Sequence, residues 1–301
     1  MRILVYGAGV LGCELAHVLL QNKKNDVTLL ARGEWKERID QKGLVIRQWA
    51  QRKTTVDRVR TIDVLAPEDF YDLVFVVLQA GQLPDVLPVL KANRSPYFVF
   101  VGNDPHAKQV LEAMQRPADK VAFGFQNTAG RRERDRVVSV HTGVGMTVGG
   151  ATAPLSGTFR IRLKTAFDGT KYKLTFYSDM DEWLKCHIAF ILPVCYVCYA
   201  CNGDLTRATK QQRAAILDAQ KNGLDETMFT ECKKTTYGNL VREQNNVSAV
   251  TNALVASHMA GCGLYDTMQV LSEMTLEDCN CFLREEVDVE RMTLSIIAPA
   301  K

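Results

Sequence analysis

The sequence lacks the features that mark membrane, secreted and nucleic-acid-binding proteins. Its formal net charge is only +3, and its basic residues are scattered among acidic ones, which argues against a nucleic-acid partner. No signal peptide is recognisable, and the nine cysteines show no disulfide-like spacing, so a reducing cytoplasm is the expected compartment. The longest apolar run, residues 188–200, contains Pro193 and is too short to cross a bilayer. It is predicted to form a buried core helix.

The cysteines do not predict a metal site. Five of them stand in two closely spaced groups: Cys195, Cys198, Cys201, Cys279 and Cys281. On a single helix, spacings of three and six residues distribute the first three thiols around the axis, so they do not converge on one ion. Free cysteines are commonly small buried hydrophobic residues. We therefore expect no metal.

The strongest signal lies near the start of the chain. Residues 2–6 form a short run of β-forming residues, and residues 13–20 have helical spacing. Between them stands a loop with the GxGxxG pattern of dinucleotide-binding proteins, made of Gly7, Ala8, Gly9, Val10, Leu11 and Gly12. The first glycine makes the tight turn, the second lets the backbone approach a pyrophosphate, and the third permits close packing of helix on strand. The N–H groups that begin the helix would then face the phosphates.

The end of the next β-run, residues 26–31, indicates which dinucleotide is bound. In NAD sites an acidic side chain about twenty residues beyond the glycine pattern contacts the ribose, whereas an arginine accommodates the extra phosphate of NADP. Here Arg32 follows the strand, and the first carboxylate after it is Glu34. The sequence therefore favours NADP, with Lys36 as a second cation nearby. Considered alone, an arginine such as Arg32 is more commonly a solvated loop residue, and its position after the strand is what favours the functional role.

The rest of the first half alternates between strand and helix patterns. Strands are predicted at 43–49, 60–65, 72–78, 97–101 and 120–125, and helices at 83–92 and 106–114. This alternation predicts a parallel sheet with helices on both faces. Residues 137–150, 158–163 and 173–177 then read as strand after strand, which predicts an antiparallel extension of the sheet.

The pattern changes near residue 178. Residues 178–181 resemble the start of a capped helix, and helical periodicity dominates afterwards, over 204–243 and 247–273. The predicted fold class is therefore α/β, with an N-terminal Rossmann-like doubly wound parallel sheet and a C-terminal all-helical domain. We predict an NADP-binding domain at 1–178 and a helical domain for substrate binding and dimerisation at 179–301. The expected partners are a small-molecule substrate and, as a possible assembly, a second copy of the chain in a homodimer.

Several segments, in this order and spacing, resemble the ketopantoate reductases (2-dehydropantoate 2-reductases). They are 2–12, 29–34, 100–103, 130–132 with 137–143, and 182–185. The resemblance implies a Rossmann domain and a helical domain with the active site in the cleft between them. It also implies NADPH-dependent reduction of a small 2-oxo acid to a 2-hydroxy acid, ketopantoate to pantoate being the family's reaction.

The resemblance assigns roles to two residues. Lys185 matches the family lysine that contacts the keto and hydroxyl oxygens of the substrate. Hydride delivery to a 2-oxo carbon develops negative charge on oxygen, which an ammonium group can stabilise and protonate. Asn103 follows a predicted strand, at the edge of the sheet where ligands bind, and matches an asparagine that holds substrate and lysine beside the nicotinamide. As bland alternatives, Lys185 would be a surface lysine and Asn103 a turn former.

The sequence also departs from the family pattern. After the strand at 72–78 the family commonly has a cofactor-binding lysine, and this chain has Gln79, which keeps hydrogen bonding but removes a charge. Where the family has pocket asparagines, residues 187–193 are mostly apolar. A loose alignment puts Cys262 and Met274 where the family has a serine and a glutamate. Two alternatives therefore stay open: a non-catalytic NADP-binding sensor or scaffold, and a reductase of a more apolar 2-oxo substrate.

Overall fold

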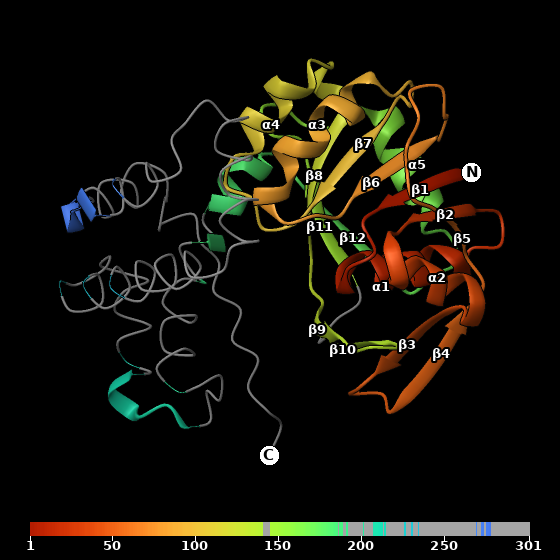
Figure 1. Ribbon diagram of the computed structural model, residues 1–301. Helices are drawn as coiled ribbons and strands as arrows, with labels where there is room; N and C mark the ends of the chain where they lie inside the picture. Colours follow the sequence, from red (N-terminus) through yellow and green to blue (C-terminus); the bar gives the residue numbers. More distant parts are fainter. Residues whose placement is uncertain are drawn as a thin grey trace. The chain divides into compact units, whose positions relative to one another are not determined.

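The structure is a computed structural model. It describes residues 1–140 and 145–185 in full, together with isolated positions farther on: 187–188, 191, 201, 207–212, 214, 226, 230, 234, 269, 272–273 and 275–277. The chain divides into two compact units, Met1–Leu184 and Lys185–Lys301. The first unit carries all the labelled elements of Figure 1.

The first unit is built on an eight-stranded sheet with the order β12-β11-β8-β7-β6-β1-β2-β5. These strands are β1 (Arg2–Tyr6), β2 (Asp26–Leu30), β5 (Arg60–Ile62), β6 (Leu73–Val76), β7 (Phe98–Val101), β8 (Val121–Gln126), β11 (Gly145–Gly149) and β12 (Lys173–Tyr177). The six strands from β5 to β8 are parallel, whereas β11 is antiparallel to β8 and parallel to β12. The strand order reverses between β1 and β6, as in a doubly wound sheet.

Helices cover both faces of this sheet (Figure 1). They are α1 (Val10–Gln21), α2 (Gly33–Lys42), α3 (Leu83–Ala92), α4 (Ala107–Met114) and α5 (Gly157–Ala166), with the short 3-10 helices η1 (Ala80–Gln82) and η2 (Ala118–Lys120). Alternate residues of β1 divide between the two faces: Ile3 and Val5 pack with α1 and α5, while Leu4 and Tyr6 pack with α3 and α4. The structure thus confirms the predicted α/β class with a doubly wound sheet in the first unit. The predicted C-terminal all-helical domain lies almost entirely outside the described residues.

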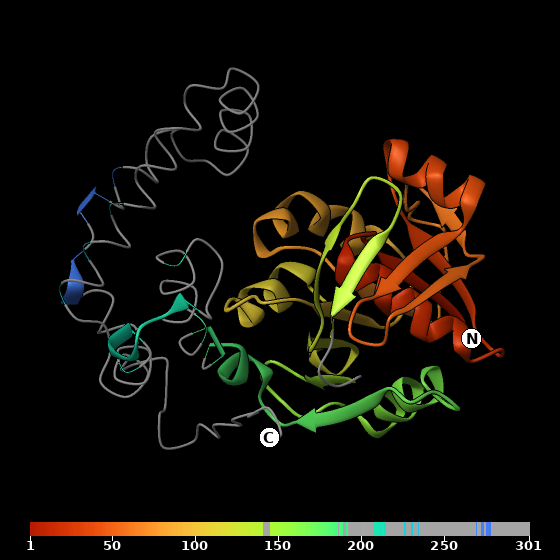
Figure 2. The ribbon, with the colours of Figure 1, turned by 90° about the horizontal axis from the view of Figure 1, so that it is seen from below.

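A second, four-stranded sheet has the order β4-β3-β10-β9. Its strands are β3 (Leu44–Gln48), β4 (Lys53–Asp57), β9 (Ala129–Arg132) and β10 (Val137–Val140). Strand β10 pairs parallel with β3, and the other two pairings are antiparallel. In Figure 2 the yellow-green hairpin of β9 and β10 runs beside the orange β3 and β4.

Three strand predictions for the first unit need correction. Residues 158–163 form part of helix α5: the Ser156 hydroxyl accepts a hydrogen bond from the Phe159 N–H, and Phe159 and Leu163 bury one face while Ile161 is 66% exposed. The stretch 137–150 is divided between β10 and β11, which belong to different sheets, and β12 pairs parallel rather than antiparallel with β11. Strands β4 and β9 and helix α2 were not predicted.

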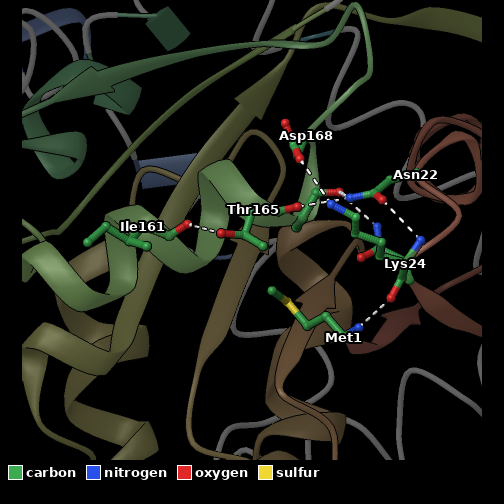
Figure 3. Close-up of polar contacts among 8 residues, drawn as sticks. Met1, Asn22, Lys24, Ile161, Thr165 and Asp168 are labelled. Atoms are coloured by element: carbon green, nitrogen blue, oxygen red, sulfur yellow. Dashed lines mark hydrogen bonds and ion pairs between the residues drawn. The ribbon is translucent and has the colours of Figure 1, made fainter.

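Two asparagines hold the end of α5 to the loop after α1. Figure 3 shows the first of them, Asn22, beside Thr165. The Nδ2 atom of Asn22 donates to the carbonyl oxygens of Thr165 at 3.0 Å and Ala166 at 3.4 Å. Asn25 donates to the Ala166 carbonyl as well, at 2.8 Å. The last carbonyls of a helix have no partner within it. The Thr165 carbonyl also accepts from the Asp168 N–H at 3.3 Å, and the two asparagine side chains supply donors to the Ala166 carbonyl. A nearby exposed ion pair joins Lys24 to Asp168 at 3.9 Å.

Several predictions lie outside the described residues. They concern the helix at 188–200, the helical stretches 204–243 and 247–273, both cysteine groups apart from Cys201, and the positions Cys262 and Met274. Within the described part of the chain, Cys201 is a buried free thiol, and no group of three or more His, Cys, Asp and Glu residues could hold a metal ion. No helix among the described residues is long and apolar enough to span a bilayer.

Candidate cofactor and active site

The carboxyl ends of the central strands bring several predicted residues to one edge of the sheet. The glycine loop follows β1, Gln79 follows β6 and Asn103 follows β7. The loops touch: a Cβ added at Gly7 would lie 2.4 Å from the carbonyl oxygen of Val77, and one at Gly102 would lie 3.0 Å from that of Leu78. This edge includes the point between β1 and β6 where the strand order reverses, the usual ligand site of open α/β sheets.

Each glycine of the loop meets a different requirement. Gly7 has φ +119°, a conformation that favours glycine. A Cβ at Gly12 would lie 1.9 Å from the carbonyl oxygen of Gly7, so only glycine lets α1 pack this closely on the loop. A Cβ at Gly9 would meet nothing within 4 Å. The backbone at Gly9 therefore borders open space.

The N-terminus of α1 suits an anionic ligand. Gly9 is its N-cap residue, no side chain caps it, and its first turn holds no acidic residue. Its backbone N–H groups and the positive end of the helix dipole are therefore available to a phosphate. Together with the open space at Gly9, this arrangement fits the pyrophosphate of a dinucleotide.

Arg32 lies just beyond β2 and is the N-cap residue of α2. Its exposed side chain reaches across to β1, where Nη2 donates a hydrogen bond of 3.2 Å to the hydroxyl of Tyr6. Gly33 has φ +55°, and a Cβ there would meet nothing within 4 Å. Lys36, the second cation predicted here, is bound to Asp40 on the same helix at 2.7 Å.

Gln79 and Asn103 are both exposed. Gln79 caps the short helix η1, and its backbone N–H donates to Oε1 of Gln82 at 3.1 Å. Asn103 stands between two fixed residues: Gly102 donates to the carbonyl of Gly124 at 3.0 Å, and the buried Asp104 accepts from the N–H of His106 at 2.9 Å. Asn103 therefore projects from an anchored loop.

Gln126, at the carboxyl end of β8, was not among the predicted site residues. It is 2% exposed, and its Nε2 atom donates to the carbonyl of Leu11 at 3.5 Å and to the Thr128 hydroxyl at 3.1 Å. Its Oε1 atom is buried without a hydrogen-bond partner. The sequence signal that could have identified it is a polar amide side chain at the last position of an otherwise apolar strand.

The helix that begins at Met180 leads to Lys185. Its start is fixed by the Asp179 carboxylate, which accepts from the N–H of Glu182 at 3.0 Å, and by the Met180 N–H, which donates to Gly150 at 2.8 Å. The buried Asp181 binds the Nζ atom of Lys108 on α4 at 3.1 Å. Lys185 opens the second unit and is partly buried. The structure does not place it relative to the sheet edge.

The family model described as ketopantoate reductase PanE/ApbA matches residues 3–153, half of the chain. Many solved structures share the fold, among them the following three. The 2-dehydropantoate 2-reductase from Geobacter metallireducens GS-15 has a TM-score of 0.59 at 20% identity over 73% of both chains. D-mandelate dehydrogenase with NADH and anilino(oxo)acetate has a TM-score of 0.58 at 15% identity, over 72% of this chain and 70% of that one.

The third is the dimeric ketopantoate reductase from Staphylococcus aureus, with a TM-score of 0.53 at 12% identity over 96% of this chain and 95% of that one. At these identities the likeness to solved structures shows the fold alone. No curated protein sequence is significantly similar to this chain.

Proposed function

Because the chain belongs to the ketopantoate reductase family, we propose that it reduces a 2-oxo acid to a 2-hydroxy acid with NADPH. Ketopantoate, which would give pantoate, is the first substrate to test. The observation that carries the proposal is the glycine loop at the point where the strand order reverses: the open space at Gly9 faces an uncapped helix N-terminus. Such a site binds the pyrophosphate of a dinucleotide.

The chain's own residues divide the work of binding. Gly7 to Gly12 would hold the pyrophosphate through backbone N–H groups, and Arg32 would meet the 2′-phosphate of the adenosine ribose. Gln79 and Asn103, on neighbouring exposed loops, would contact the rest of the cofactor. When bound, reduced nicotinamide supplies a hydride.

Lys185 is proposed as the electrophile and proton donor. As the keto carbon is reduced, charge gathers on its oxygen, and an ammonium group beside that oxygen stabilises the charge and then supplies the proton. Asn103 would orient the substrate and Lys185 by hydrogen bonds. Two features support these roles: the fixed start of the helix that leads to Lys185 and the anchored loop that carries Asn103.

The test follows NADPH oxidation by absorbance with ketopantoate and a panel of 2-oxo acids, with NADH for comparison. We expect turnover that prefers NADPH and falls by about a hundredfold or more in Lys185→Ala. Lys91→Ala, which removes an exposed lysine of α3, serves as the matched control and is expected to keep full activity. Equal activity in both variants would rule out the role given to Lys185.

A non-catalytic NADP sensor is the second candidate, and Gln79 favours it. The family commonly has a cofactor-binding lysine here, whereas this glutamine caps η1. The same assay separates the two functions, because a sensor binds NADPH and reduces no member of the panel. Turnover confined to bulky apolar 2-oxo acids would instead support a reductase of different specificity.

A further inference from the structure

We propose that Tyr6 sets the preference for the 2′-phosphorylated cofactor by holding the guanidinium of Arg32 in a binding position. This inference rests on the proposed function, in which Arg32 meets the 2′-phosphate. Tyr6 would act as a positioning residue for Arg32, and its phenol as a second hydrogen-bond donor at the same phosphate.

Tyr6 offers a rigid support. It is the last residue of the central strand β1, pairs with Leu30 on one side and Val76 on the other, and is only 4% exposed. Its carbonyl accepts from the N–H of Val77 at 2.9 Å. Because the backbone and ring are fixed in the core, the hydroxyl occupies a defined place at the carboxyl edge of the sheet.

Arg32 gains order from this contact without losing charge. An exposed arginine has many rotamers, and fixing one of them before the ligand arrives lowers the entropic cost of binding. Two other cations of this segment are held by carboxylates: Lys36 by Asp40 and Arg38 by Glu34. Arg32 is held by a neutral hydroxyl, and in the described part of the chain it forms no ion pair. Its positive charge therefore stays available to a phosphate.

The hydrogen-bond inventory fits a phosphate. The guanidinium has five N–H donors, of which the Tyr6 hydroxyl takes one, and the phenol keeps its own O–H while it accepts from Arg32. Arginine and phenol together can thus offer several donors to one anionic group. The open space at Gly33, next to Arg32 in the chain, leaves room for it.

Tyr6→Phe tests the inference because it keeps the ring and removes one hydroxyl. Calorimetric titration would measure the affinities for adenosine 2′,5′-bisphosphate and for 5′-AMP, which differ by the phosphate in question. We expect the affinity for the bisphosphate to fall on the order of tenfold, the equivalent of one hydrogen bond to a charged group, and the affinity for 5′-AMP to stay unchanged.

Tyr71→Phe is the matched control, since Tyr71 is also a buried tyrosine of this core face and lies at the opposite end of β6, before its first residue. Its removal should leave both affinities unchanged. In an Arg32→Ala background, Tyr6→Phe should weaken bisphosphate binding by a smaller factor than in the unmodified protein, because only the direct donor of the phenol is then lost. A general loss of packing would give the same factor in both backgrounds.

The outcomes separate the two proposals. If the unmodified protein binds the bisphosphate no better than 5′-AMP, the NADP assignment fails, and the inference fails with it. If the unmodified protein prefers the bisphosphate and Arg32→Ala loses this preference while Tyr6→Phe keeps it, the NADP assignment stands and the role of Tyr6 is overturned. Arg32→Lys keeps the positive charge but loses the planar set of N–H donors of the guanidinium. It is a second test variant and should also weaken bisphosphate binding.

Discussion

At the scale of single residues, two glycines of one loop have opposite relations to their surroundings. Gly12 is enclosed, because an added Cβ would lie 1.9 Å from the Gly7 carbonyl, whereas Gly9 faces open space. The first is needed for packing and the second for a ligand. The sequence pattern predicted both roles, since GxGxxG encodes them by position, and the structure supplies the steric reason.

Alanine substitutions should separate these roles. We expect Gly12→Ala to lower the free energy of unfolding by about 1–3 kcal/mol, because the loop and α1 must move apart. Gly9→Ala should change stability by less than about 1 kcal/mol but weaken NADPH binding by about tenfold or more. Urea denaturation and cofactor-fluorescence titration of both variants provide the measurements. A stable Gly12→Ala protein would contradict the packing argument.

The contact between Arg32 and Tyr6 shows what residue-level prediction omitted. The position of Arg32 directly after β2 predicted that it binds the 2′-phosphate of the cofactor. The structure leaves this prediction untested. It does add the hydroxyl that holds the side chain. A hydrogen bond between the ends of two adjacent strands depends on their register, which no local pattern in the sequence records.

At the scale of elements, α5 depends on a cap that comes from another part of the chain. Residues 158–163 alternate apolar and polar residues, as a strand does, yet burial at Phe159, Leu163 and Ala166 follows helical spacing. Asn22 and Asn25 complete the last turn from the loop after α1. Because these donors are distant in sequence, the helix could not be recognised from its own residues.

Removing this cap should destabilise the protein. Asn22→Ala removes donors to Thr165 and Ala166, and we expect the free energy of unfolding to fall by about 1–1.5 kcal/mol, the net contribution of a hydrogen bond. The loss is limited because the Asp168 N–H still donates to the Thr165 carbonyl and Asn25 to that of Ala166. Lys24→Ala breaks only the exposed ion pair with Asp168 and should cost no more than about 0.5 kcal/mol. Urea denaturation of the two variants measures the difference. Equal losses would show that the cap is unimportant.

A second long-range contact joins α1 to β4. Nδ1 of His17 lies 2.6 Å from Oδ2 of Asp57, and Gln21, Glu14 and Lys53 lie around this pair. Burial acts to lower the pKa of His17, but the hydrogen bond and negative charge of Asp57 outweigh it, so the pKa is raised above its usual 6.5.

The raised pKa makes part of the stability depend on pH. Protonated His17 is favoured by folding, so its contribution is fully present below about pH 6.5 and is lost as the pH rises through the raised value. We expect Asp57→Asn to cost about 1.5 kcal/mol at about pH 6 and clearly less at about pH 9. Urea midpoints at both pH values test this, with Asp26→Asn at an exposed ion pair as control. A cost independent of pH would contradict the assignment.

At the scale of the whole molecule, the parallel strands at the centre of the main sheet could be predicted, whereas the parallel pairing of β11 with β12 and the assembly of the small sheet could not. The strands β1, β2, β6, β7 and β8 are short, apolar and separated by helices, so local pattern and the rules of doubly wound topology were sufficient. The small sheet joins residues of the β3–β4 hairpin to residues of the β9–β10 hairpin. The pairing of β10 with β3 is long-range, and β4 and β9 are mostly exposed. Neither property leaves a local signal.

The candidate site divides in the same way. Its glycine loop, Arg32, Gln79 and Asn103 follow predicted strands, so topology alone places them near one edge. Lys185 depends on a second unit, and its role stays a prediction that kinetics must decide. Gln126 and Tyr6 were not predicted, because each is linked to the site by a hydrogen bond to a residue from another strand or helix.

The parallel pairing of β10 with β3 joins Val137 to Ile46, about ninety residues apart in the chain. It therefore closes a long loop of the chain, and this loop contains β5, β6, β7 and β8. Closing so long a loop costs more chain entropy than forming either of the two local hairpins. We therefore expect an order of folding. The β3–β4 and β9–β10 hairpins involve only local contacts, whereas the pairing of β10 with β3 becomes favourable only after the main sheet has brought the two hairpins close together.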